Sequence, residues 1–356
     1  MRQCAVGIGG RMEQLSMFDI LYDEFKIKNK IRLIELFAGI GSQAMALREL
    51  GADFEHYKIS EWEVSADASY NAIHNKMDFR NYGKGKTKEQ LVRKLYKKGI
   101  SNDGKTPMSY SEIKKKSYFW CLKVYNSFCQ NQNLGSITKI KGSSLRIIDT
   151  DNYCYLMTYT FPCQDLSVAG KQRGMAKGSG TRSGLLWEVE RLLNEVENLP
   201  QVLLMENVPQ VHGEANMPHF IDWIDFLKSK GYSSYWQDLN AKNYGVAQNR
   251  DRCFMVSILG DWNYRFPQPI PLTKTMKDYL EDEVDERYYI NNEKAQKLID
   301  KLLADGTIPQ SRAEQTCIDL TINEPRRIEV ANCIAARTDR GISNHRQEGS
   351  GIVEYK

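Results

Sequence analysis

Short apolar runs alternate with amphipathic segments along the first two thirds of the chain, a pattern that predicts strands alternating with helices. Strands are expected at residues 31–37, 54–60, 153–160, 201–205, 232–239 and 253–259. Apolar residues at helical spacing predict helices over 14–25, 42–50, 184–197 and 219–230. Such alternation is typical of a mostly parallel sheet covered on both faces, so we predict an α/β fold with a doubly wound sheet.

The alternation ends near Leu259, and the remainder of the chain is expected to form a second, smaller and incomplete unit. Three prolines lie between residues 267 and 271, followed by a predicted acidic helix at 277–287 and a second helix at 292–303. A polar stretch without a clear period follows. We therefore expect an N-terminal extension over 1–30, a main domain over 31–260 and a partial domain over 261–356.

Composition narrows the class of protein. With 41% hydrophobic and 26% charged residues, the chain has an ordinary globular composition, and its formal charge of +4 is not that of a polycation. We expect no membrane segment and no signal peptide, because no apolar run is long enough. None of the eight cysteines forms a C-x-x-C pair and the five histidines are scattered, so we expect no metal site and no disulfide framework. Free thiols favour a cytoplasmic protein.

Residues 76–130 differ from the rest because lysines and arginines are interleaved with aromatic side chains while acids are few. Basic residues mixed with aromatics can contact a phosphate backbone. Solvated helix faces explain the same pattern, and both readings remain open at this point.

The candidate functional residues lie at the ends of the predicted strands, which is where α/β sheets have their ligand-binding and active sites. Cys163 follows Pro162 at the end of one apolar strand and is either a nucleophile or a buried structural cysteine. Gly39 and Gly41 form a strand-to-helix turn that either lets a ligand approach the backbone or is simply tight. Glu61 lies about twenty residues further on, where an acid meets ribose hydroxyls, and the adjacent Trp62 can cover an adenine. A surface glutamate and a core tryptophan are the alternative.

Two later positions complete the candidates. Glu206 ends the strand at 201–205 and is either functional or paired with a structural arginine. Arg250 and Arg252 stand at alternate positions before the last strand and therefore point to the same side. They can bind carboxylates structurally, or a substrate carbonyl and phosphate.

Together these pieces resemble the DNA cytosine-5 methyltransferases, over roughly residues 31 to 290. The resemblance is carried, in order, by Phe37-Ala38-Gly39-Ile40-Gly41, Glu61-Trp62, Phe161-Pro162-Cys163-Gln164, Glu206-Asn207-Val208 and Gln248-x-Arg250-x-Arg252. It implies a Rossmann-like, S-adenosylmethionine-dependent methyltransferase domain over 31–260 with a basic insertion at about 76–130. It also implies a partial target-recognition domain over 261–356, double-stranded DNA as partner and S-adenosylmethionine as cofactor.

The resemblance implies roles for single residues. Cys163 matches the thiolate that adds to cytosine C6, Glu206 the carboxyl group at the N3 and N4 edge, and Arg252 the contact to O2, supported by Arg250. The implied cofactor residues are Phe37, Ala38, Gly39, Ile40, Gly41, Glu61, Trp62, Ser136, Ile137, Pro162 and Leu185. The loop 164–180 resembles the segment that closes over a flipped base, with Gln164, Ser167 and Arg173 as DNA contacts.

The sequence departs from the family in three places. Ser136, in Gly135-Ser136-Ile137, stands where the family has an aspartate near the adenine, which predicts weaker cofactor binding. The basic insertion is absent from minimal members. The last two family motifs are not found, so we expect a chain cut inside its recognition domain, with a second chain as a candidate source of those motifs.

The leading hypothesis is a site-specific DNA cytosine-5 methyltransferase of a restriction–modification system or a phage. The alternatives are a DNA-binding remnant or half of a split enzyme, an RNA cytosine-5 methyltransferase, and, more distantly, a nicotinamide-dependent enzyme.

Overall fold

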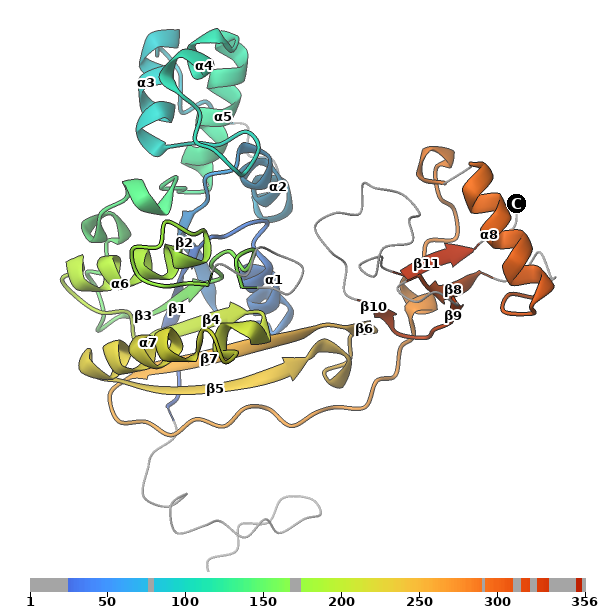
Figure 1. Ribbon diagram of the computed structural model, residues 1–356. Helices are drawn as coiled ribbons and strands as arrows, with labels where there is room; N and C mark the ends of the chain where they lie inside the picture. Colours follow the sequence, from blue (N-terminus) through green and yellow to red (C-terminus); the bar gives the residue numbers. More distant parts are fainter. Residues whose placement is uncertain are drawn as a thin grey trace, which may run out of the picture. The chain divides into compact units, whose positions relative to one another are not determined.

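The computed structural model describes residues 25–75, 80–166, 174–289, 292–309, 315–320, 325–332 and 350–353 (Figure 1). The chain divides into two compact units. The first contains the described residues up to Trp236 and Phe254–Arg265, and the second contains Gln237–Cys253 and the described residues from Phe266 onward. Apart from Phe25, the helix predicted over 14–25 lies outside the described residues.

The first unit is built on a six-stranded sheet with the strand order β2-β1-β3-β4-β7-β5. Its strands are β1 (Lys30–Leu36), β2 (Phe54–Ser60), β3 (Tyr153–Tyr159), β4 (Val202–Asn207), β5 (Tyr232–Asn240) and β7 (Asp251–Leu259). β1 pairs in parallel with β2 and β3, and β3 pairs in parallel with β4. The strand order reverses at β1, because the chain goes first to β2 on one side and then to β3 on the other. Doubly wound sheets bind their ligands at this position.

Helices cover both faces of the sheet, as the alternation of strands and helices predicts (Figure 1). Ala44 of α1 (Ser42–Glu49) packs in one buried cluster with Leu33 and Leu156. On the other face, the indole N–H of Trp223, in α7 (Met217–Ser229), donates to the Tyr159 hydroxyl at 3.1 Å. Leu156 and Tyr159 are three positions apart on β3, so their side chains point to opposite faces. α6 (Leu186–Glu195) lies beside α7, with the rings of Trp187 and Trp223 6.4 Å apart.

Residues 80–131 form a helical lobe between β2 and β3 in the sequence. It consists of α3 (Lys88–Lys98), α4 (Tyr110–Lys115) and α5 (Tyr118–Gln130). Capping boxes start α3 at Thr87 and α4 at Ser109. The lobe has its own core of Leu91, Val92, Leu95, Ile100, Met108, Ile113, Cys121, Val124 and Phe128. The segment is therefore a folded part of the unit.

Helix α2 (Val64–His74) joins the lobe to the sheet. Its buried Asp67 accepts hydrogen bonds from Ser127 Oγ at 2.6 Å and from Asn131 Nδ2 at 2.8 Å. Both donors lie at the end of α5 or directly after it, so this end of the lobe is held against α2.

The second unit contains α8 (Glu293–Ala304), which agrees with the helix predicted over 292–303. Leu302 packs with Ile308, Ile318 and Val353 in a small core. A three-stranded antiparallel sheet has the order β11 (Ser350–Val353), β8 (Thr316–Asp319) and β9 (Arg326–Arg327), while β10 (Ala331–Asn332) pairs with β6 (Gln248–Asn249).

The prediction of a helix over residues 277–287 is wrong. The structure has two single 3₁₀ turns instead, at Met276–Tyr279 and Glu286–Tyr288. Five of the six residues from 281 to 286 are acidic, and like charges at helical spacing repel one another. The segment also ends its first turn at Leu280, whose backbone is extended.

Candidate active site at the carboxyl ends of the strands

The carboxyl ends of β1, β3 and β4 carry three of the predicted motifs side by side. Leu36 pairs with Tyr159, and Tyr159 pairs with Met205, so the three strands end in register. Beyond the strands, Thr160 Oγ donates to the Phe37 carbonyl at 3.1 Å, and Asn207 Nδ2 donates to the Phe161 carbonyl at 2.9 Å. These contacts bring the glycine turn, the segment of Cys163 and the segment of Glu206 to one edge of the sheet.

The turn after β1 has a left-handed backbone at three positions. The φ angles are +60° at Phe37, +54° at Gly39 and +82° at Gly41. A Cβ at Gly41 would lie 2.3 Å from His74 Nε2 and 2.6 Å from a Tyr70 ring carbon, whereas a Cβ at Gly39 would have no heavy atom within 4 Å. Gly41 is thus required by the packing of α2. Gly39 leaves open space beside the turn, which permits close approach of a ligand.

Glu61, directly after β2, lies against this turn. One carboxylate oxygen accepts from the Gly39 N–H at 2.9 Å, and the other accepts from the Glu63 N–H at 2.7 Å. Burial raises the pKa of Glu61, and the backbone N–H groups partly oppose this. The half-buried Trp62 follows, with its carbonyl accepting from the Ser101 N–H at 2.7 Å. The structure therefore brings Gly39 and Glu61 together, and Trp62 is the next residue of the chain.

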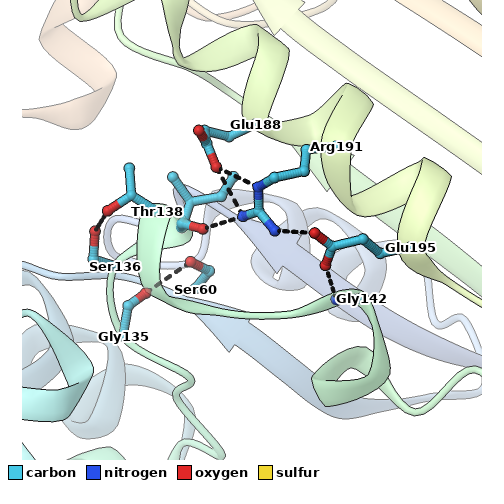
Figure 2. Close-up of polar contacts among 9 residues, drawn as sticks. Ser60, Gly135, Ser136, Thr138, Gly142, Glu188, Arg191 and Glu195 are labelled. Atoms are coloured by element: carbon cyan, nitrogen blue, oxygen red, sulfur yellow. Dashed lines mark hydrogen bonds and ion pairs between the residues drawn. The ribbon is translucent and has the colours of Figure 1, made fainter.

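Ser136 and Ile137, two of the predicted cofactor residues, belong to a segment that lies beside the carboxyl end of β2. The segment forms a 3₁₀ turn there, at Ile137–Lys139, and not a strand. Asn133 fixes this segment, because its side chain accepts from the Glu61 N–H at 3.1 Å and donates to the Glu61 carbonyl at 2.9 Å. Ser60 Oγ donates to the Gly135 carbonyl, while Ser136 Oγ lies 3.0 Å from Thr138 Oγ1 (Figure 2). Ile137 is buried.

Arg191 of α6 holds the far side of the same segment. Its guanidinium pairs with Glu188 and Glu195, each at 2.8 Å, and donates to the Ile137 carbonyl at 3.0 Å (Figure 2). Glu195 also accepts from the Gly142 N–H at 2.8 Å. Asn133 and Arg191 were missed by the sequence analysis. Each residue makes its decisive contacts far away in the sequence: Asn133 binds Glu61 across 72 residues, and Arg191 binds the Ile137 carbonyl across 54.

Cys163 is half-buried in the segment after β3. Ser183 Oγ donates to the Pro162 carbonyl at 2.6 Å, which holds the predicted cofactor residue Pro162 near the 3₁₀ turn Ser183–Leu185 that contains Leu185. The buried Asp165 accepts from the Arg182 N–H at 2.7 Å. Asp165 thus closes the base of the loop, a role that the sequence did not reveal.

The predicted DNA contacts of this loop have different positions. Gln164 is exposed, and its Oε1 accepts from the Arg182 guanidinium, which also donates to the Gly104 carbonyl of the helical lobe. Ser167 and Arg173 lie outside the described residues. The two described ends of the loop meet directly, because the Gly174 N–H donates to the Asp165 carbonyl at 3.0 Å.

Glu206 is half-buried on β4, next to the buried Asn207. Arg250 and Arg252 belong to the second unit. There the Arg250 N–H donates to Asn240 Oδ1 at 3.3 Å, and Arg252 Nη1 donates to the Asp251 carbonyl at 2.6 Å.

A buried polar network lies beneath the glycine turn and was also missed. Tyr70 donates to Glu35 Oε2 at 2.6 Å, and its hydroxyl lies 2.8 Å from His56 Nδ1. His74 Nε2 lies 2.9 Å from the Ile40 carbonyl. Burial raises the pKa of Glu35 to about 7 and lowers that of His56 to about 4. The network supports the turn through His74, which contacts the Ile40 carbonyl, and through the packing of Tyr70 and His74 at Gly41.

Among the described residues, no helix is both long and apolar enough to cross a bilayer.

Comparison with known proteins identifies the relatives of this arrangement. The model of the family described as C-5 cytosine-specific DNA methylase matches residues 31–100 and 96–326. The orphan methyltransferase M.SssI of Spiroplasma monobiae is 37% identical over 273 residues, which are 75% of this chain and 70% of the relative. The type II methyltransferase M2.ScrFI of Lactococcus lactis subsp. cremoris is 37% identical over 264 residues, or 74% and 71% of the two chains. The crystal structure of the S. pombe Dnmt2 methyltransferase shares the fold, with a TM-score of 0.52 and 15% identity over 90% of this chain and 75% of that one.

Proposed function

Because the chain belongs to the family of C-5 cytosine-specific DNA methylases, we propose that it methylates cytosine in specific DNA sequences through the thiolate of Cys163. Membership of this family shows that the protein is a DNA cytosine-5 methyltransferase. The roles of single residues and the site specificity are what we propose. One observation supports them above all. Cys163 and Glu206 follow or end neighbouring parallel strands, and the Asn207–Phe161 hydrogen bond ties the two segments together.

The residues around the glycine turn fit S-adenosylmethionine. Gly39 leaves open space beside a left-handed turn, and the Glu61 carboxylate is held at the same place by two backbone N–H groups. A carboxylate so fixed keeps further lone pairs to accept from ribose hydroxyls. Phe37, Trp62, Ile137, Pro162 and Leu185 would supply apolar surface for the adenine and the chain of the cofactor. When bound, S-adenosylmethionine supplies an electrophilic methyl group.

The chemistry that these residues perform follows from the weak nucleophilicity of cytosine C5. The Cys163 thiolate adds to C6, and the electron pair of the C5–C6 double bond moves to C5, which can then take the methyl group. Glu206 holds the N3 and N4 edge and assists protonation there, while Arg252 contacts O2 and Arg250 supports its loop. Loss of the C5 proton and departure of the thiolate restore the aromatic ring. The base must first leave the duplex, as it does for other base-modifying enzymes.

Transfer of a labelled methyl group to mixed-sequence DNA tests the proposed nucleophile. Cys163→Ser and Cys163→Ala should abolish incorporation at C5. Cys129→Ser is the matched control, because Cys129 is also half-buried but lies in the helical lobe, and it should retain activity. DNA with 5-fluorocytosine should trap a covalent adduct with the wild type, because fluorine replaces the proton that must leave C5. Methyl transfer by Cys163→Ala, or an adduct with Cys163→Ser, would refute the mechanism.

We further propose that the second unit takes part in choosing the DNA sequence and that the enzyme works in a restriction–modification or phage setting. The names of its relatives, type II and orphan methyltransferases, support the setting. Bisulfite sequencing of DNA methylated by the protein should show one common sequence around the modified cytosines, and that DNA should resist an endonuclease that cuts the same sequence. Modified cytosines without any common flanking sequence would contradict site specificity.

A further inference from the structure

The positive charge of the protein is concentrated in the helical lobe. Residues 80–131 contain thirteen lysines and arginines but three acids, a net charge of +10, whereas the whole chain carries +4. The rest of the chain therefore carries −6. Such a separation of charge within one chain is typical of a surface that meets a polyanion.

The three acids of the lobe are already engaged. Glu89 pairs with Arg93 at 3.1 Å and accepts from the Tyr110 hydroxyl. Asp103 accepts from the Lys105 and Thr106 N–H groups of its own turn at 2.8 and 3.0 Å, which together lower its pKa to about 2. Glu112 caps α4 through Ser109. These contacts are local to the acids' own turns and helices, and the net charge of the lobe stays at +10.

Two of these lysines lie near the same aromatic ring. Lys86 Nζ and Lys94 Nζ lie 5.8 and 5.9 Å from the centroid of the Tyr125 ring. Among the described residues neither one forms an ion pair, and Lys94 is exposed. Two ammonium groups within about 6 Å of one ring centroid, neither of them in an ion pair within the described part of the chain, are available to an anion such as a phosphate.

The lobe reaches the edge of the sheet that carries the candidate active site. Ser101 is bound to the chain after β2 through Trp62 and Val64, at 2.7 and 2.9 Å. The next turn, at Gly104, accepts from the Arg182 guanidinium, which also binds Gln164 beside Cys163. The exposed Lys105 directly follows Gly104. A duplex that delivers a base to Cys163 therefore passes close to the turn of the lobe.

We infer that the helical lobe is a phosphate-backbone surface, which holds substrate DNA through Lys105 and the lysines around Tyr125. The inference rests on the proposed function, because it places the duplex at Cys163. Lysine contacts to phosphates add affinity and carry no sequence information. The lobe would thus hold DNA in position, while the choice of sequence lies elsewhere.

The test is the salt dependence of DNA binding by the full chain, measured by fluorescence anisotropy with a mixed-sequence duplex of about 30 base pairs, a length well beyond a typical recognition site. In the triple variant K86A/K94A/K105A, the slope of log K against log salt should fall by about 0.9 for each phosphate that the variant no longer neutralises. Affinity near physiological salt should fall about tenfold or more. The arginine triple variant K86R/K94R/K105R should retain most of the slope.

A matched control removes three lysines at the other end of the sheet. Lys26, Lys28 and Lys30 are exposed and precede or begin β1 at its amino end, so K26A/K28A/K30A should leave the slope unchanged. The inference is overturned if the lobe variant keeps the wild-type slope, if the control lowers it equally, or if the lysines affect binding of single-stranded RNA but not of the duplex.

Methyl transfer measured on the same proteins separates the two proposals. An active wild type whose lobe variant keeps its slope would refute the surface and leave the proposed function intact. If the wild type transfers no methyl group but its salt slope depends on the lysines, the proposed function is refuted. The assignment of the lobe as a phosphate-backbone surface would then still stand.

Discussion

Glu35 and His56 meet at one hydroxyl, that of Tyr70, and they should affect stability in opposite directions as the pH changes. The pKa of Glu35 rises from 4.5 to about 7 in the folded protein. Its contribution to stability is therefore complete below pH 4.5 and is lost as the pH rises through 7. The pKa of His56 falls from 6.5 to about 4. Its contribution is present above pH 6.5 and is lost as the pH falls through 4.

The two contributions have similar size. Each pKa difference corresponds to about 3 kcal/mol, since one pH unit is worth about 1.4 kcal/mol; for the half-buried His56 this is an upper value, because solvent screens it. Between pH 4.5 and 6.5 the two trends oppose each other in the wild type. In Glu35→Gln the Glu35 trend is gone while the His56 trend is shared with the wild type, so the free energy of unfolding relative to wild type should rise by about 3 kcal/mol between pH 4.5 and 7. In His56→Gln it should fall with pH by about as much.

Urea unfolding followed by tryptophan fluorescence measures this effect in the first unit alone, because all six tryptophans belong to it. The quantity to compare is the difference between each variant and the wild type at each pH, in which the other ionisable groups cancel. Glu49→Gln, an exposed change at the end of α1, is the control. If the Glu35→Gln difference does not change with pH, the two groups do not oppose each other as the network requires.

Three further predictions concern single contacts. Gly41→Ala should destabilise the first unit by about 2–5 kcal/mol and weaken S-adenosylmethionine binding in calorimetry, because the added methyl group meets His74 and Tyr70. Gly39→Ala meets no protein atom and should cost only about 1 kcal/mol; equal unfolding energies would contradict the steric explanation. Asn207→Ala and its control Asn198→Ala each remove a side-chain hydrogen bond to a backbone carbonyl, of 2.9 and 3.0 Å, and should each cost about 1–3 kcal/mol. Only Asn207→Ala should slow methyl transfer by folded protein, and equal rates in the two variants would argue against its positioning role. Leu302→Ala should destabilise the second unit by about 2–5 kcal/mol. Circular dichroism should detect this change, and an equal shift in tryptophan fluorescence would show that the two units unfold together.

The sheet could be predicted because several of its strands are short apolar runs, such as 153–160, whose pattern is visible within a few residues. The positions of Gly39, Cys163 and Glu206 followed from the same runs, since the ends of parallel neighbouring strands lie at one edge. In the second unit the strands are two to four residues long. Runs that short carry no measurable period, so β8 to β11 were not predicted.

The supporting residues could not be predicted for another reason. Asn133 binds Glu61 across 72 residues of sequence, and Tyr70 binds Glu35 across 35. Their roles depend on which elements become neighbours after folding, and no local pattern encodes that. Glu35 is a single polar residue in an apolar strand. The sequence alone does not show whether such a side chain is buried, as Glu35 is, or exposed.

The place of the helical lobe in the sequence also bears on how the protein folds. β1 must pair with β3 across a long stretch of chain; Arg32 and Tyr155 on these strands are bonded 123 residues apart. Closing so long a loop is entropically unfavourable and slows folding. The lobe contains local contacts and its own core, so its early formation would shorten the effective loop between β2 and β3. Leu95→Ala in that core should then slow refolding of the sheet in stopped-flow fluorescence, whereas a change that only accelerates unfolding would place the formation of the lobe after the rate-limiting step.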